Sequence, residues 1–428
     1  MVTDIHQSFV FRALRKYDNT VGKIFPIKPK KYVKSTSSES TIIEQNPLID
    51  ELSKQKLEKK DIVCFPIINW DFRSQRPQHI LSQFAQKGHR IFYFRTSLRN
   101  LSKTYQINKI SDNIFEVEVS FDHYFEIYKD RFNDKLIQSF ISNFKILCDD
   151  VNLDPILFVQ FPTWEPLVRK LKDKFHYKII FDCLDDFTGF SNVNKQRKYE
   201  EELLFQHSDL VLGTSQFLIK KITKFSSNYL FSPNAGDFIH FSTKPVKGML
   251  RNTKKPIIGY FGSIAEWFDT ELLEYLAKSR PNFSFIMIGH TFGSDIRNLK
   301  KLSNVKFLGE RPYSELPKYL HDFDACIIPF RDIPLIEATH PVKIYEYFAS
   351  GKPVVSTMLS ELLPMSKLCY LAKNQSEFLQ KLDVAINEND KNLINLRKKF
   401  SSENTWNHRF AELYDKLNEN SFDVEHHS

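Results

Sequence analysis

The sequence lacks any apolar run of about 18 residues, which is the length that a membrane-spanning helix needs. Its first residues also lack the unbroken apolar stretch of a secretory signal peptide. The five cysteines of the 428-residue chain are scattered and form no Cys-x-x-Cys pair. This spacing argues against a zinc site and a disulfide framework, and it is typical of a reducing compartment. These absences predict a cytoplasmic protein.

Three common motifs of nucleotide and acyl chemistry are also missing. No Gly-x-Gly-x-x-Gly fingerprint follows a predicted strand, and no P-loop of the form GxxxxGK[ST] occurs. The GxSxG nucleophile elbow is absent as well. A ligand that carries phosphates would therefore be held by helix N-termini and a few side chains.

The net charge of +8 is concentrated at the N-terminus. Residues 1–60 hold 12 Lys and Arg against 7 Asp and Glu, so they account for +5 of the total. The remaining body is close to neutral, which predicts no nucleic-acid partner. Aromatic and basic residues are interleaved in FVFRALRKY and beyond it. Residues 1–35 are therefore expected either to contact an anionic membrane surface or to form a solvated, partly disordered leader.

From Asp61 onward, short apolar runs alternate with amphipathic segments, which is typical of parallel βαβ units. Strands are predicted at 61–67, 89–97, 155–161, 177–183, 209–215, 228–234, 256–263, 283–290, 304–310, 324–330 and 353–357. We therefore predict an α/β fold with two doubly wound, Rossmann-like domains that face a cleft. The expected division is a leader (1–60), an N-terminal domain (61–241), a linker (242–256), a C-terminal domain (257–400) and a final helix with its tail (401–428).

The stretch HPVKIYEYFASGKPVV, residues 340–355, places Lys343 and Glu346 on the first turn of a predicted helix. This helix follows the predicted strand 324–330, so its start lies beyond the carboxyl end of a strand, where doubly wound folds bind ligands. The alternative is a surface ion pair, because residues three apart on a helix are neighbours.

Six segments carry a resemblance to a known family. They are WDFRSQRPQHI (70–80), FDCLDDF (181–187), SPNAGDFIHF (232–241), IGYFGSIAEWFD (258–269), FLGERPYSELPKYL (307–320) and HPVKIYEYFASGKPVV (340–355). In this order they resemble retaining glycosyltransferases of the GT-B fold, family 4, in particular the branch that builds bacterial surface polysaccharides such as teichuronic acid. The resemblance covers roughly residues 61–416 and implies that the helix around Trp406 crosses back onto the first domain.

The resemblance implies a nucleotide-sugar site in the C-terminal domain. Glu346 would accept both ribose hydroxyls, since two vicinal hydroxyls can donate to one carboxylate. Lys343 would meet the diphosphate together with the positive end of the helix dipole. The implied donor-binding residues are Glu346, Lys343, Gly262, Ser263, His290, Arg311, Tyr313, Pro341 and Val342. For Arg311 and Tyr313, the alternative is a plain turn with a core tyrosine.

The sequence departs from the family pattern at two places. Many members carry a second glutamate eight positions before the ribose one, and here that position is Ala338, with Glu337 beside it as a possible substitute. The family also places an Arg and a Lys after the first strand of the nucleotide domain, whereas this chain has GSIAEWFD (262–269).

In the first domain, the polar cluster FRSQRPQHI follows the first strand and opens a helix. Arg73, Arg76, Gln78 and His79 are expected to contact the acceptor or a phosphate, and Trp164 is expected to line the acceptor site. The alternative for the cluster is a solvated helix start. Asp185 and Asp186 follow another strand, where carboxylates can orient an acceptor hydroxyl or stabilise an oxocarbenium-like charge. Asn234 and Asp237 match the hinge region of the family.

The predicted function is transfer of a sugar from a nucleotide-sugar, with a UDP-sugar as the expected donor, to a lipid-linked or polysaccharide acceptor. The expected catalytic residues are Lys343, Glu337, Asp185 and Asp186. The resemblance implies retention at the anomeric carbon and no metal or other cofactor. The enzyme would work in the cytoplasm, at the inner face of the membrane if the leader binds there. The alternatives are a catalytically inactive GT-B scaffold that partners another transferase, or a sugar-nucleotide epimerase.

Overall fold

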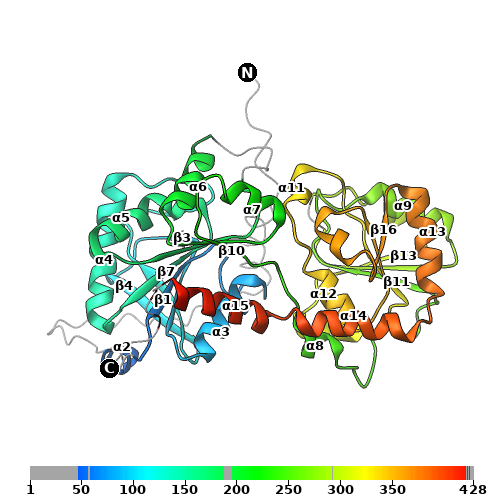
Figure 1. Cartoon of the computed structure of the whole chain (residues 1–428), viewed down its shortest axis with the longest axis horizontal. Helices are drawn as coiled ribbons and strands as arrows, with labels where there is room; N and C mark the ends of the chain where they lie inside the picture. The colour runs from blue at the N-terminus through cyan, green and yellow to red at the C-terminus, as the bar shows by residue number, and fades with distance from the viewer. Residues whose placement is uncertain are drawn as a thin grey trace, which may run out of the picture.

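The computed structural model of the chain describes residues 47–55, 58–187, 195–291, 293–420, 422 and 424. Two lobes lie side by side, and each is built around its own sheet (Figure 1). This arrangement confirms the predicted α/β fold with two doubly wound halves. The prediction for residues 1–35 falls outside the described residues.

The N-terminal lobe contains an eight-stranded sheet of order β10-β9-β8-β7-β1-β2-β5-β4. Its strands are β1 (Asp61–Phe65), β2 (Ile91–Phe94), β4 (Tyr105–Ser111), β5 (Ile114–Val119), β7 (Pro155–Val159), β8 (Ile179–Cys183), β9 (Leu210–Gly213) and β10 (Tyr229–Phe231). Neighbouring strands pair in parallel, except that β4 and β5 form an antiparallel hairpin. A small antiparallel sheet joins β3 (Ser97–Leu98) to β6 (Phe125–Glu126).

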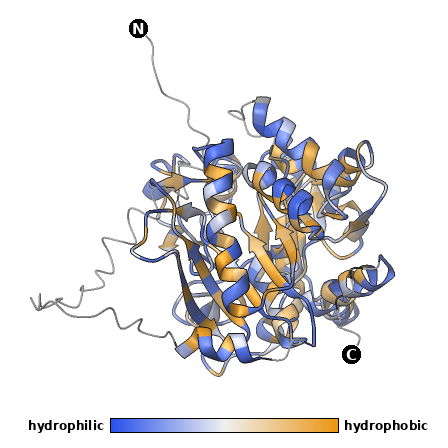
Figure 2. Ribbon diagram, turned by 90° about the vertical axis from the view of Figure 1, so that its left-hand side faces the viewer, coloured by the Kyte–Doolittle hydropathy of each residue, from blue (hydrophilic) through white to orange (hydrophobic). Residues whose placement is uncertain are grey.

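Helices cover both faces of this sheet, because alternate residues of its strands enter two different cores. In β1, Val63 and Phe65 belong to one buried cluster, whereas Ile62 and Cys64 belong to another. The helices of this lobe are α2 (Pro47–Lys54), α3 (Arg76–Gln86), α4 (Asp134–Val151), η1 (Pro162–Trp164), α5 (Glu165–Phe175), α6 (Lys195–His207) and α7 (Gln216–Ile222). Figure 2 shows strands in hydrophobic colour between helices with hydrophilic outer faces.

The C-terminal lobe contains a six-stranded parallel sheet of order β13-β12-β11-β14-β15-β16. Its strands are β11 (Ile257–Phe261), β12 (Ser284–Ile288), β13 (Val305–Gly309), β14 (Ala325–Ile328), β15 (Val354–Thr357) and β16 (Tyr370–Ala372). The helices of the C-terminal half are α8 (Phe238–Ser242), α9 (Thr270–Ser279), η2 (Leu299–Lys301), η3 (Tyr313–Glu315), α10 (Leu316–Leu320), α11 (Pro334–Glu337), α12 (Lys343–Ala349), η4 (Ser360–Met365), α13 (Gln375–Ile386), α14 (Lys391–Glu403) and α15 (Trp406–Glu419).

The last helix, α15, crosses back from the C-terminal lobe onto the first one, as predicted (Figure 1). Its buried residues include Trp406, Phe410 and Leu413, which join the core cluster of the N-terminal lobe. The Phe410 ring meets Phe84 of α3 edge to face, with centroids 4.8 Å apart. The predicted start of the helix at residue 401 is wrong, because Thr405 caps a new helix by accepting from the backbone N–H of His408.

Every strand predicted from the sequence is present, and each is shorter than predicted. The hairpin β4–β5 and the strands β3, β6 and β16 were not predicted. The β4–β5 hairpin turns at Asn113, whose φ of 59° lies in the left-handed region that asparagine tolerates well. Its strands lie at one edge of the sheet, and β4 is mostly exposed, so it carries only a weak apolar pattern.

Candidate active site between the lobes

The carboxylate of Glu346 is buried on α12, with only 8% of the residue exposed. It forms no ion pair with Lys343, so the alternative of a surface ion pair is wrong. Burial raises the pKa of Glu346 to about 7, with the charge of Asp237 adding to the shift and that of Lys343 opposing it. Within the described part of the chain, the carboxylate has no hydrogen-bond partner. Its oxygens are not among the fully buried side-chain atoms that lack a partner, so they keep some contact with solvent and are accessible to a ligand that donates hydrogen bonds.

The ammonium of Lys343 lies against the turn that follows β11. Gly262 has a φ of +140°, and a Cβ there would lie 2.1 Å from Lys343 Cε. The Lys343 Nζ also lies 5.5 Å from the ring centroid of Tyr260 and 5.9 Å from that of Phe330. Burial lowers the pKa of Lys343, and the neighbouring Arg73 lowers it further, whereas Glu346 raises it. The glycine therefore leaves room for a buried cation at this turn.

Arg73 of the N-terminal lobe reaches across to the same turn. Its Nη1 donates to Ser263 Oγ at 2.8 Å, and its Nε donates to Glu310 Oε1 at 2.6 Å. The structure thus brings Arg73, predicted to contact the acceptor or a phosphate, next to two residues predicted for the donor, Ser263 and Lys343. Three cationic or donor groups from two lobes converge there, which is a suitable arrangement for phosphate oxygens.

A layer of aromatic rings lies beside Glu346. Tyr313 stacks on His240 with ring centroids 4.7 Å apart, and it lies 6.0 Å from His79 of α3. His79 in turn stacks on Trp406, with centroids 4.9 Å apart. Burial raises the pKa of Tyr313, with Glu346 and Asp237 adding to the shift. Burial lowers the pKa of His79 to about 4, so its ring is neutral at physiological pH.

Three residues predicted to bind the acceptor are instead buried within the N-terminal lobe. Arg76 is 4% exposed and pairs with Asp182 at 2.9 Å, and it also donates to the backbone and hydroxyl oxygens of Ser232. Gln78 is held in a capping box with Gln75 at the start of α3. Trp164 is fully buried, and its Nε1 donates to the carbonyl of Pro66 at 2.9 Å. The contacts of these three side chains with other described residues stabilise the fold of the N-terminal lobe.

Four further residues were predicted to bind the donor, and their surroundings differ. Pro341 is buried, and Val342 packs against a core cluster of the N-terminal lobe. His290 is exposed after β12, and its carbonyl accepts from the N–H of Ile264 at 3.0 Å. Arg311 donates through Nε to Tyr319 Oη at 3.1 Å and through Nη1 to the carbonyl of Glu310. No contact among the described residues tests the roles of these four, so their roles remain predictions.

The two aspartates after β8 have different surroundings. Asp186 pairs with Lys221 at 2.7 Å, and Lys221 also pairs with Glu201 at 2.6 Å. The carboxylate of Asp185 makes no ion pair within the described residues, and burial raises its pKa to about 7, with Asp186 adding to the shift. Of the two, Asp185 is therefore better suited to exchange a proton near neutral pH.

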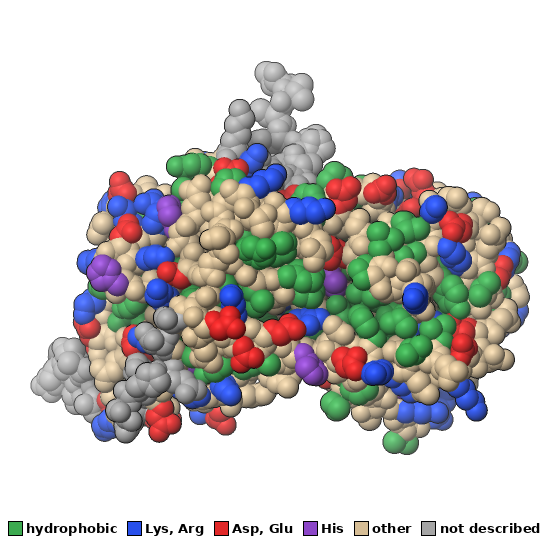
Figure 3. Space-filling model, viewed as in Figure 1, with side chains coloured by type: hydrophobic (Ala, Val, Ile, Leu, Met, Phe, Trp, Pro, Cys, Tyr) green, Lys and Arg blue, Asp and Glu red, His purple; other side chains and the backbone are tan. Residues whose placement is uncertain are grey.

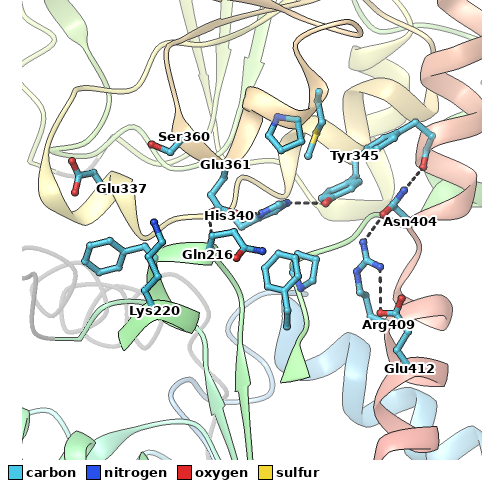
Figure 4. Close-up of a pocket in the computed structure, with 16 residues that line it drawn as sticks. Gln216, Lys220, Glu337, His340, Tyr345, Ser360, Glu361, Asn404, Arg409 and Glu412 are labelled. Atoms are coloured by element: carbon cyan, nitrogen blue, oxygen red, sulfur yellow. Dashed lines mark hydrogen bonds and ion pairs between the residues drawn. The ribbon is translucent and has the colours of Figure 1, made fainter. Parts of the chain in front are cut away.

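Glu337, the proposed substitute for the missing glutamate, faces a different hollow. Figure 4 shows it with Lys220 and Glu361 in a cavity of about 610 Å³ between the lobes. Within this cavity, His340 joins Glu361 and Tyr345 through contacts of 2.9 and 2.7 Å. Glu361 also accepts from the backbone N–H of Gln216, which links the lobes. Among the described contacts, none joins Glu337 to Lys343 or Glu346.

Sequence reasoning missed several groups that shape the site. Glu310 and His240 lie inside recognised segments but were given no role, and Trp406 was read only as part of an apolar stripe. Asp237 was assigned to the hinge, yet it lies close enough to affect the pKa of both Glu346 and His79. The signal was present in these segments, but only the folded chain shows that they meet.

Within the described ranges, no cluster of three or more His, Cys, Asp or Glu side chains is arranged to hold a metal ion. All five cysteines are buried and unpaired. None of the helices in the described part is long and apolar enough to span a membrane.

Comparison with known proteins gives a consistent result. Residues 255–387 match the family described as glycosyl transferases group 1. Over 260 residues the chain is 25% identical to TuaH of Bacillus subtilis (strain 168), which is named as a putative teichuronic acid biosynthesis glycosyltransferase. That match covers 55% of this chain and 66% of the relative, which is just under two thirds of its length.

Solved structures share the fold at low sequence identity. Sucrose-phosphate synthase from Thermosynechococcus elongatus superposes with a TM-score of 0.64 and 13% identity, covering 85% of this chain and all of that one. HepE of Anabaena in complex with UDP and glucose gives a TM-score of 0.61 and 13% identity, covering 84% of this chain and all of that one. The family match places residues 255–387 among the group 1 glycosyltransferases, the solved structures show that the chain has the GT-B fold, and the 25% identity makes it a distant homologue of TuaH.

Proposed function

We propose that the chain transfers a sugar from a nucleoside diphosphate sugar to a hydroxyl of a growing cell-surface polysaccharide or lipid-linked oligosaccharide, with retention at the anomeric carbon. The observation that carries this proposal is the buried carboxylate of Glu346, which has no hydrogen-bond partner in the described chain and lies one turn from Lys343. The name of TuaH and the UDP complex of HepE favour a UDP-sugar and a surface polysaccharide.

In the proposed complex, Glu346 accepts the two ribose hydroxyls, and Tyr313 lies beside the base. The diphosphate lies between Lys343, Ser263 and Arg73, close to the first turn of α12. This short helix contributes only weakly through its dipole, so the side-chain cations provide most of the stabilisation of the leaving diphosphate. Because charge develops on that diphosphate as the glycosidic bond breaks, these cations bind the transition state more tightly than the ground state.

The acceptor hydroxyl must lose a proton as it attacks. In the proposed mechanism, the departing diphosphate takes this proton on the same face of the sugar, which would preserve the anomeric configuration. Asp185 is a second proton acceptor on the N-terminal lobe, with a pKa of about 7. Contacts between the lobes, such as that from Arg73 to Ser263, would exclude water and thereby suppress donor hydrolysis.

The first test is thermal unfolding of the purified chain with UDP, GDP, ADP, CMP and TDP. One nucleotide should raise the melting temperature, because a ligand at one hundred times its Kd stabilises the folded state by about 2.7 kcal/mol. Glu346→Ala should abolish the shift, whereas Glu271→Gln, at an exposed site on α9, should retain it. If no nucleotide stabilises the wild type at millimolar concentration, the proposal fails.

A noncatalytic GT-B scaffold is the second candidate. It is favoured by Ala338, which stands where many relatives carry a glutamate and is fully buried in the core cluster of the N-terminal lobe. Glu337 faces the cavity of Figure 4 and does not replace that carboxylate beside Lys343. Tight nucleotide binding without release of nucleoside diphosphate from any nucleotide-sugar, in the presence of membrane acceptors, would support the scaffold.

A further inference from the structure

The segment between α8 and β11 carries an unusual concentration of positive charge. Residues 242–256 contain five basic residues and no acidic one, and these are Lys244, Lys247, Arg251, Lys254 and Lys255. Lys255 pairs with Asp324 at 2.7 Å. The other four make no ion pair with the described residues and are exposed. Their charge is therefore available to a partner.

The same segment exposes apolar side chains. Val246 is fully exposed, at 101%, and Met249 is 51% exposed. Ile239 on the adjoining α8 is 73% exposed. Scattered exposed apolar residues are ordinary, but here three of them accompany a run of cations without ion-pair partners in the described chain. In Figures 1 and 3 the segment that follows α8 projects from the lower edge of the C-terminal lobe, with hydrophobic side chains at its tip and Lys and Arg beside them.

The projection is held in shape from beneath. Leu250 is buried, and its backbone N–H donates to Asp322 Oδ2 at 2.7 Å. The N–H of Met249 donates to the carbonyl of Lys318 at 3.2 Å. Gly248 lies so close to Asp322 that a Cβ there would meet its Oδ1 at 2.1 Å. These anchors fix the base of the segment, so Val246 and Met249 are presented outward.

Lys247 and Arg251 also face Lys306 of β13 across a shallow hollow of about 480 Å³. No Asp or Glu is among the residues that line the hollow, whereas three of these residues are Lys or Arg. The hollow therefore presents an excess of positive charge to a phosphate group. Apolar side chains beside cations suit a surface where phosphates overlie hydrocarbon.

We propose that residues 239–251 form a docking surface for an anionic lipid membrane, with Val246 and Met249 entering the interface and Lys247 and Arg251 meeting lipid phosphates. The exposed apolar tip favours lipid over nucleic acid, whose phosphates would need the cations alone. The cations and exposed apolar side chains of this surface have no part in the proposed transferase chemistry, although His240 of the same segment stacks on Tyr313 in the candidate site. If the proposed function is correct, the docking surface would also hold the active site beside a lipid-linked acceptor.

The test places an environment-sensitive fluorophore at the tip of the full-length chain. Val246→Cys can be labelled selectively, because the native cysteines are at most 7% exposed. Val384→Cys on α13 is the matched control, since that residue is 55% exposed on another face. Vesicles of phosphatidylcholine containing phosphatidylglycerol should shift the emission of the label at position 246 to the blue and leave the control unchanged. Pure phosphatidylcholine vesicles should have little effect, and high salt should reverse the shift.

Lys247→Ala combined with Arg251→Ala should weaken vesicle binding roughly thirtyfold, because each basic residue near an anionic surface contributes about fivefold. The absence of a blue shift at position 246, an equal shift at 384, or an unchanged affinity of the double variant would each overturn the docking surface. A blue shift of the same size with heparin would also overturn it, because polyanion binding would then suffice. UDP-induced thermal stabilisation of the same variants reports separately on the proposed transferase site.

Discussion

At the scale of single residues, the buried carboxylate of Glu346 presents the clearest conflict between stability and function. A carboxylate without a hydrogen-bond partner costs folding free energy when it is ionised. Lys343 offsets part of that cost, but its own pKa is lowered by burial. Such a pair is better explained by a ligand that satisfies both charges than by a role in folding.

The pKa of Glu346 predicts a pH-dependent effect on stability. In the folded chain the pKa is about 7, above the ordinary value of 4.5, so the folded state binds this proton more tightly than the unfolded state. Its contribution to stability is therefore fully present below about pH 4.5 and is lost as the pH rises through 7. Glu346→Gln should stabilise the ligand-free chain at pH 8 by up to about 3 kcal/mol, and by less at pH 5.

Urea unfolding of the wild type and of Glu346→Gln at pH 5 and at pH 8 measures this difference in stability. Glu271→Gln, on the exposed first turn of α9, is the control and should show no comparable dependence. An equal or smaller gain at pH 8 than at pH 5 would show that Glu346 is not held in the described environment.

At the scale of helices and strands, the sequence was sufficient to predict the elements that depend on local patterns of apolar and polar residues. Apolar runs such as 61–67 and 155–161 became buried parallel strands, because a strand covered on both faces is apolar throughout. The start of α12 at Lys343 was also placed correctly. The hairpin β4–β5 was missed because its edge strand is polar and exposed.

What the sequence could not supply was the identity of long-range partners. Arg73 and Arg76 stand three positions apart in one polar cluster and look equivalent there. In the fold, Arg76 is buried against Asp182, 106 residues away, whereas Arg73 reaches Ser263, 190 residues away, in the other lobe. The sequence does not show which of the two arginines is buried within its lobe and which faces the other lobe. This depends on which distant segments approach each of them in the fold.

The turn after β11 gives a prediction at this scale. Gly262→Ala should displace Lys343, since the new methyl group would lie 2.1 Å from Lys343 Cε, and UDP affinity should fall at least tenfold. Gly309→Ala is a matched control, because Gly309 also has a positive φ, of +72°, but no atom lies within 4 Å of the position that a Cβ would take there. Both variants should lose stability through backbone strain of about 1–2 kcal/mol. Isothermal titration with UDP distinguishes them, and equal losses of affinity would contradict the role of Gly262.

At the scale of the whole molecule, the candidate site depends on both lobes. Glu346, Lys343 and Ser263 belong to the C-terminal lobe, whereas Arg73 and His79 come from α3 and the loop before it. The helix α15 fixes α3 to the rest of the chain through contacts such as Phe410 with Phe84. The family pattern places an Arg and a Lys after the strand that corresponds to β11, and this chain lacks both. In the structure, Arg73 of the N-terminal lobe reaches that turn and donates to Ser263.

This arrangement predicts that binding of the diphosphate, but not of the nucleoside, requires the N-terminal lobe. Arg73→Ala should weaken UDP binding about tenfold to one hundredfold, because hydrogen bonds to charged groups contribute about 1.5–3 kcal/mol. Uridine binding should be unchanged, since Arg73 contacts the phosphate side of the site and not the carboxylate of Glu346. The UDP affinity of Arg73→Lys should lie between those of the wild type and Arg73→Ala, because lysine keeps the charge but loses the forked geometry of the guanidinium.

Arg99→Ala is the control, since Arg99 pairs with Glu118 on the surface of the same lobe. Titration calorimetry with UDP and with uridine gives the two affinities for each variant. A similar loss for both ligands would mean that Arg73 acts on closure of the lobes as a whole, and no loss for either would remove it from the donor site. A loss confined to UDP would show that the phosphate site is assembled from both lobes, because only the ligand that carries phosphates would then depend on an arginine from the N-terminal lobe.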